Sequence, residues 1–167
     1  MKRNEKIAYL GILTALAFGF SYVEFLIPFD AIGIPGIKLG LANLVVMAVL
    51  YLFGPLDAAL VSVVRITLSW LLFGNFAGFI YSICGGVLSL AVMILVKKTD
   101  FFSEIGVSVC GGVMHNIGQL TAAAFMIGFR AALYYLPVLV IAGTLTGALN
   151  GVLLKIILPR LGLKIKR

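Results

Sequence analysis

The chain has 167 residues, of which 62% are hydrophobic and only 11% are charged, and its formal net charge is +7. Soluble domains contain about 45–50% apolar and about 25% charged residues, because a compact fold cannot hide a larger apolar share from water. The composition therefore excludes an ordinary soluble domain and predicts a polytopic membrane protein, in which each polar residue at bilayer depth is a candidate for the functional site.

The apolar runs predict one transmembrane domain, residues 1–167, with six membrane-spanning helices. A helical span takes about 20 apolar residues, and the runs cover residues 7–27, 38–53, 57–73, 77–96, 105–129 and 132–157. Gly or Pro follows each of the first three runs, at Pro28, Gly54 and Gly74. Because the runs are long and their residues do not alternate in polarity, a β-barrel is disfavoured and an all-α bundle is expected.

The distribution of Lys and Arg predicts the orientation in the membrane. Six spans place both termini on one side, and the segments on that side carry these cations: Lys2, Arg3, Lys6, Lys97, Lys98, Lys155, Arg160, Lys164, Lys166 and Arg167. The loops on the other side carry only Lys38 and Arg130. This is the positive-inside bias, so both termini are expected in the cytoplasm, near anionic lipid headgroups. The topology explains the positive charge, which therefore gives no support for nucleic-acid binding.

The sequence lacks the motifs of several chemistries. One His and the two separated cysteines, Cys84 and Cys110, are too few for an ordinary zinc site. The chain has neither a GxxxxGK[ST] loop for ATP nor an aspartate-rich pair for the magnesium of diphosphate chemistry. We therefore expect no bound metal, no cofactor bound for catalysis, and no catalysis by this chain alone.

Polar residues inside the predicted spans indicate a candidate binding site. His115 and Gln119 are four residues apart, so they share one face of the fifth helix, with Asn116 beside them. Most of the polar positions lie at or above the middle of the membrane, which predicts a cavity that opens outward beneath residues 28–37. The candidate substrate-binding residues are Glu24, Lys38, Asn43, Arg65, Tyr81, His115, Asn116 and Gln119.

Several of these residues also have structural interpretations. Arg65 can pair with Glu24 or with helix carbonyls, which would stabilise a charge that costs roughly 2.5–3.5 kcal/mol at the membrane centre. A single buried His is more often a core residue than a ligand, but three polar side chains within 115–119 favour a shared site. For Asn150 a hydrogen bond between helices is the favoured interpretation.

The charge of the ligand stays open. A surplus of cations, with Arg65 and Arg130 among them, favours an anionic ligand such as a phosphate, because Arg and Lys donate charge-assisted hydrogen bonds. A neutral or zwitterionic ligand that uses Glu24 remains an alternative. Tyr81 and Ser89 either line the cavity or bond to neighbouring carbonyls.

Small residues recur every four positions in the first and the last run. The two stripes are Gly11, Ala15 and Gly19, and Gly143, Gly147 and Gly151. Such stripes let two helix backbones approach closely in lipid. Packing within the bundle is the favoured interpretation of the last stripe, whereas the first fits either packing or the docking of another membrane subunit.

Four segments resemble a bacterial family of membrane proteins. They are PGIKLGLANL at 35–44, the Arg65 helix that ends in Phe73-Gly74, Tyr81-Ser82 with Gly85-Gly86, and Gly106-Val107-Ser108 leading to HNIGQ at 115–119. The family carries two names, heptaprenyl diphosphate synthase component I and Gx transporter. It is similar in fold to the substrate-binding S components of energy-coupling factor (ECF) transporters.

The resemblance implies a multi-pass protein of the bacterial cytoplasmic membrane with six helices of the S-component type. Gly11, Ala15 and Gly19 would dock onto a transmembrane coupling subunit, and two separate ATPases would hydrolyse the ATP. The substrate would be a vitamin or cofactor, such as a flavin or an isoprenoid-related compound that carries phosphate. The synthase name implies the alternative, a non-catalytic membrane subunit of a heptaprenyl diphosphate synthase.

Overall fold

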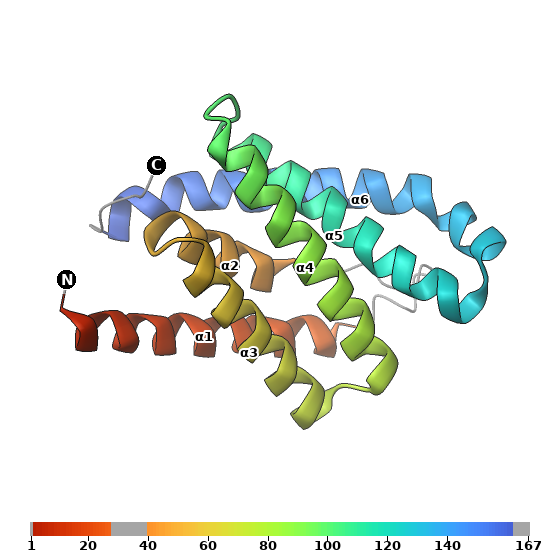
Figure 1. The fold of residues 1–167 in the computed structure, drawn as a ribbon, viewed down its shortest axis with the longest axis horizontal. Coiled ribbons are helices and arrows are strands. Elements are labelled where there is room, and N and C mark those ends of the chain that lie inside the picture. The colour runs from red at the N-terminus through yellow and green to blue at the C-terminus, as the bar shows by residue number, and fades with distance from the viewer. Residues whose placement is uncertain (1, 28–39, 162–167) are drawn as a thin grey trace.

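The computed structural model describes residues 2–27 and 40–161, and within these ranges all the regular secondary structure is helical (Figure 1). The elements are α1 (Arg3–Leu26), α2 (Leu41–Leu52), α3 (Pro55–Phe73), α4 (Phe76–Lys98), α5 (Glu104–Ile127), α6 (Phe129–Ile157) and the short 3-10 helix η2 (Leu158–Leu161). Each apolar run of the sequence therefore overlaps one α-helix, which confirms the all-α prediction for the described residues.

Four of the helical segments are long and apolar enough to cross a membrane: Arg3–Leu26, Pro55–Phe73, Phe76–Lys98 and Phe129–Leu161. Their number and hydropathy indicate a multi-pass membrane protein. Helix α5 is as long as α1 but is not among the four, in keeping with its three polar side chains at 115, 116 and 119. Length and composition therefore support four of the six predicted spans.

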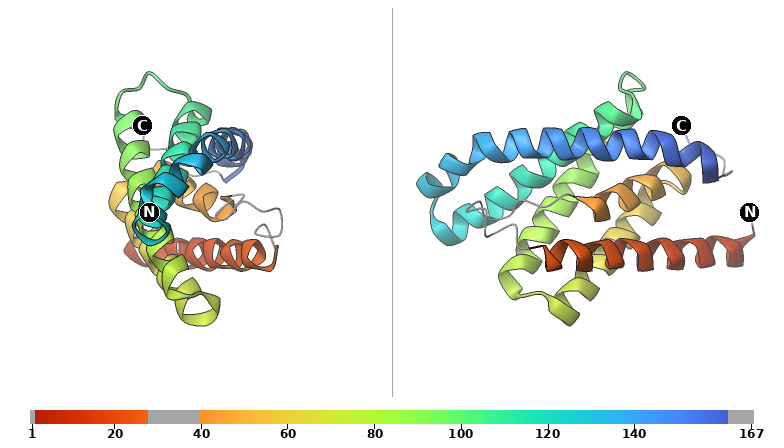
Figure 2. Two further views of the ribbon diagram at one scale, coloured as in Figure 1. Left: turned by 90° about the vertical axis from the view of Figure 1, so that its right-hand side faces the viewer. Right: turned by 180° about the vertical axis from the view of Figure 1, so that it is seen from behind.

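Helix α2 is shorter than the predicted span 38–53. It has 12 residues, so at about 1.5 Å per residue it is about 18 Å long, well short of a hydrocarbon core of about 30 Å. All its residues except Leu41 and Asn43 are buried, as expected for a helix that is apolar on every side. Figures 1 and 2 show it in the interior of the bundle, between α1 and α6.

Charged side chains from neighbouring helices stabilise both ends of α2. At its N-terminus the Leu41 N–H donates to Glu24 Oε1 of α1 at 2.6 Å. Near its C-terminus Lys97 Nζ of α4 donates to the Leu50 carbonyl at 3.2 Å and lies 4.7 Å from the centre of the Tyr51 ring. A carboxylate at the N-terminus and an ammonium at the C-terminus both complement the helix dipole and satisfy backbone groups that a short helix leaves unpaired.

The small-residue stripe of α6 packs against α5. A Cβ added at Gly143 would lie 2.8 Å from the Gly112 carbonyl oxygen, and one at Gly147 would lie 2.8 Å from the Ser108 carbonyl oxygen. The two backbones are therefore too close for any larger side chain, which confirms that this stripe serves packing within the bundle.

The stripe of α1 is different. An added Cβ at Gly11 or Gly19 would meet no atom of the described residues within 4 Å, and Ala15 is exposed. This face of α1 therefore has room for larger side chains within the described part of the chain.

One end of the bundle gathers the start of α1, the α2–α3 turn and the end of α6 (Figure 1). There Lys6 and Asp57 form a salt bridge of 2.7 Å that joins the first turns of α1 and α3. The described segments at 2–6, 97–98 and 155–160, which carry most of the cations, lie at the start of α1 and at the ends of α4 and α6.

Candidate functional site

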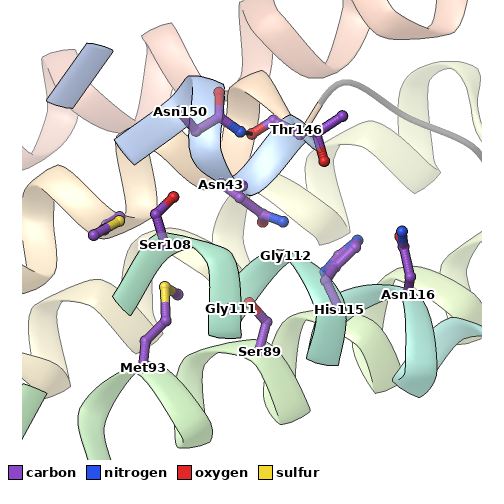
Figure 3. A pocket seen from close by; sticks show the side chains of 13 residues that line it. Asn43, Ser89, Met93, Ser108, Gly111, Gly112, His115, Asn116, Thr146 and Asn150 are labelled. Carbon is purple, nitrogen blue, oxygen red and sulfur yellow. Dashed lines mark hydrogen bonds between the residues drawn. The ribbon is translucent and has the colours of Figure 1, made fainter. Parts of the chain in front are cut away.

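A small cavity lies among α2, α4, α5 and α6, and side chains from all four helices gather around it (Figure 3). The volume open to the centre of a water molecule is about 20 Å³, which is enough for one water molecule. It is lined by Gly40, Asn43, Met47, Ser89, Met93, Ser108, Gly111, Gly112, His115, Asn116, Thr146, Gly147 and Asn150.

Seven of the thirteen lining residues have polar side chains, and in the described part of the chain none of the lining residues is Asp, Glu, Lys or Arg. The lining combines amides, hydroxyls, one imidazole and two thioethers, so it offers both hydrogen-bond donors and acceptors without a fixed charge. Ser89 is only 2% exposed, and its Oγ has no hydrogen-bond partner among the described residues. Because buried hydroxyl groups normally form a hydrogen bond, we expect Ser89 Oγ to bond to a water molecule or to a polar ligand atom in the cavity.

The α5 side of the cavity is held by hydrogen bonds. His115 Nε2 and Gln119 Nε2 are 3.0 Å apart, which is the contact expected for residues four apart on one helix face. Asn116 Nδ2 donates to the Leu139 carbonyl of α6 at 2.8 Å. These two hydrogen bonds engage all three polar side chains of the 115–119 segment.

Arg65 reaches the cavity through Asn43. Its Nη2 donates to Asn43 Oδ1 at 2.9 Å and its Nη1 to Ser21 Oγ at 3.4 Å, so it joins α3 to α2 and α1. Glu24 is near enough to stabilise the guanidinium electrostatically. Arg65 is buried but does not line the cavity, whereas Asn43 does.

The residues just before and at the start of α2 form one wall of the cavity. Asn150 Nδ2 of α6 donates to the Gly40 carbonyl at 3.0 Å, while Glu24 accepts from the next N–H, that of Leu41. Gly40 has a φ of +72°, in the left-handed region, and a Cβ there would lie 3.2 Å from Asn150 Nδ2. The left-handed backbone favours glycine at this position, and a side chain there would crowd the Asn150 amide.

The predicted site residues fall into three groups. Asn43, His115 and Asn116 line the cavity, and Gln119 contacts His115. Glu24 and Arg65 lie behind this layer and hold α2. Tyr81 is half-buried on α4 away from the cavity, and Lys38 lies outside the described residues, as does the predicted cover at 28–37.

Sequence reasoning missed Ser108 and Thr146 as lining residues. Hydroxyls are common in membrane helices because they bond to their own helix, and Thr146 Oγ1 does donate to the Ala142 carbonyl at 2.9 Å. No signal in the sequence separates such a residue from a lining one. Asn150 makes the predicted bond between helices and lines the cavity as well.

These features define a helical membrane protein with a small polar cavity enclosed by four of its helices. A family model matches the chain over residues 13–157, and the chain belongs to this family, heptaprenyl diphosphate synthase component I. The match confirms the family indicated by the motif segments, and its range includes the cavity and Arg65. No curated protein and no solved structure matches the chain.

Proposed function

We propose that this protein is the membrane-embedded substrate-binding subunit, of the S-component type, of an ECF transporter for a vitamin or cofactor. The observation that carries the proposal is the convergence of seven polar side chains on one cavity within a largely apolar bundle. Polar side chains from α2, α4, α5 and α6 converge on it. Because placing polar groups at membrane depth costs free energy, such groups usually mark a functional site.

The proposed ligand contacts are Asn43, His115 and Asn116, with Gln119 orienting His115. Glu24 and Arg65 support these contacts by holding α2. Tyr81 and Lys38 stay in the proposed set on the sequence argument alone. The ligand is proposed to be a small vitamin or cofactor, such as a flavin or an isoprenoid-related compound that carries phosphate.

The proposed partners follow from the open face of α1. Gly11 and Ala15 are exposed and a side chain at Gly11 or Gly19 would meet nothing in the described chain, which leaves room for a second helix to approach. The partner would be a transmembrane coupling subunit, with two ATPases that hydrolyse the ATP. The cationic end of the bundle would face the cytoplasm of a bacterial cell.

The ligand assignment is tested by purifying the tagged protein from native membranes in mild detergent and identifying bound small molecules by mass spectrometry. The proposal expects one vitamin or cofactor to co-purify with the unaltered protein and to be lost from His115→Ala and Asn116→Leu. Thr121→Ala, on the exposed face of the same helix, is the matched control and should retain it. Equal retention by all three variants would remove the site assignment.

The family name supports a second candidate function, a non-catalytic membrane subunit of a heptaprenyl diphosphate synthase. Such a subunit would bring a soluble catalytic partner to the membrane where its lipid product accumulates. The test is to add the purified protein to the catalytic subunit and measure product chain length and rate. A change in either would favour this candidate, and no change would remove it.

A further inference from the structure

The cavity is far too small for the ligand that the proposed function requires. Pockets for small molecules enclose about 300–1,000 Å³, whereas the space open to a water molecule here is about 20 Å³. If a vitamin-sized ligand binds here, as the proposed function holds, one wall of the cavity has to move.

Three of the four helices around the cavity form a closely packed block. Besides the α5–α6 contacts at Gly143 and Gly147, a Cβ at Gly151 would lie 2.6 Å from the Ile105 Cα. Helices α4 and α5 are equally close, since a Cβ at Gly118 would lie 2.6 Å from the Cys84 carbonyl oxygen. Backbones in direct contact over several turns leave no side chain that can swing aside, so these walls are rigid.

The α2 wall is attached differently. At its N-terminal end it is held by polar side chains from three other helices: Glu24 of α1 on the Leu41 N–H, Asn150 of α6 on the Gly40 carbonyl and Arg65 of α3 on Asn43. Side-chain hydrogen bonds can be exchanged for bonds to a ligand or to water, whereas backbone packing cannot. Asn43 and Asn150 already line the cavity, so a ligand that enters it meets these bonds first.

We propose that the first turn of α2 is the movable wall of the cavity, and that Glu24, Asn150 and Arg65 form a clasp that keeps it closed. Two of the clasp contacts involve α1, because Arg65 also donates to Ser21. The clasp therefore links the cavity to the helix whose opposite surface carries the open small-residue stripe. A partner that shifts α1 would loosen or tighten the wall.

The test uses thiol accessibility in the purified full-length chain and needs no ligand. The two native cysteines are replaced (Cys84→Ala, Cys110→Ala) and a reporter is placed in the cavity by the nearly isosteric change Ser89→Cys. The probe is the water-soluble reagent methanethiosulfonate ethylammonium. Glu24→Ala should raise the modification rate by about tenfold, because removing one clasp bond favours the open wall. Val23→Ala, its lipid-exposed neighbour, should leave the rate unchanged.

A second variant and a second reporter guard against misfolding. Asn150→Leu keeps the side-chain volume, breaks the bond to Gly40 and should also raise the rate. A reporter at Val107, fully buried on α5 outside the cavity lining, should stay protected in both variants. The proposal is overturned if neither clasp variant raises the Ser89→Cys rate, or if the Val107→Cys rate rises equally. Because no ligand is present, this result is separate from the outcome of the ligand search.

Discussion

Arg65 shows at the scale of one residue how this bundle accommodates a buried charge. Its guanidinium bonds to Ser21 and Asn43, and the Glu24 carboxylate stabilises it electrostatically. Glu24 in turn accepts from the Leu41 N–H. The two charges are therefore interdependent, and each helps to fix the start of α2.

Removing only one of these charges should be more damaging than removing both. Arg65→Met removes the guanidinium that bonds to Ser21 and Asn43 and that the Glu24 carboxylate stabilises, and we expect the free energy of unfolding to fall by about 1–3 kcal/mol. Arg65→Met combined with Glu24→Gln should recover part of that loss. The measurement is unfolding of the purified variants in detergent. A double variant that is less stable than Arg65→Met alone would show that the charges do not compensate each other.

The predictability of the site also differs from residue to residue. Asn43, His115 and Asn116 were identifiable because amides and imidazoles are rare at membrane depth. Ser108 and Thr146 were not, because a hydroxyl can bond to its own helix at little cost. The sequence also could not predict that Arg65 lies behind the cavity lining. Its position depends on which face of α3 packs against α2, and a single sequence does not define that face.

At the scale of elements, the sequence predicts where the helices occur better than what surrounds them. All six runs overlap an α-helix, but the run 38–53 was predicted as a span, whereas Leu41–Leu52 is a short buried helix. An apolar run has the same sequence pattern whether lipid or other helices surround the helix that it forms. The burial of all its residues except Leu41 and Asn43, together with the contacts of Glu24 and Lys97 at its two ends, identifies α2 as an internal element.

The two small-residue stripes should respond oppositely to the same substitution. Gly147→Leu places a side chain into the α5 backbone, and we expect it to lower stability by about 1–3 kcal/mol or more through overpacking. Gly11→Leu adds its side chain to open space and should leave the stability of the isolated protein unchanged. Thermal unfolding of the two variants in one detergent measures this. Similar losses in both would mean that the α1 face is packed within the chain.

At the scale of the whole molecule, the asymmetry of charge predicts the orientation. In a background without native cysteines, Arg130→Cys in intact cells should react with a membrane-impermeant maleimide, whereas Lys98→Cys should react only after the cells are opened. Both side chains are exposed, so accessibility reports the side of the membrane rather than burial. The reverse pattern would contradict cytoplasmic termini.

The most direct test of the transporter proposal is co-purification of partner proteins from native membranes in mild detergent. We predict that the unaltered protein recovers a transmembrane coupling subunit and two ATPases. Gly11→Leu, although stable by itself, should lose them because its added side chain fills the docking face. Recovery of a soluble prenyl diphosphate synthase subunit, with no coupling subunit or ATPase, would contradict the proposal and favour the synthase alternative.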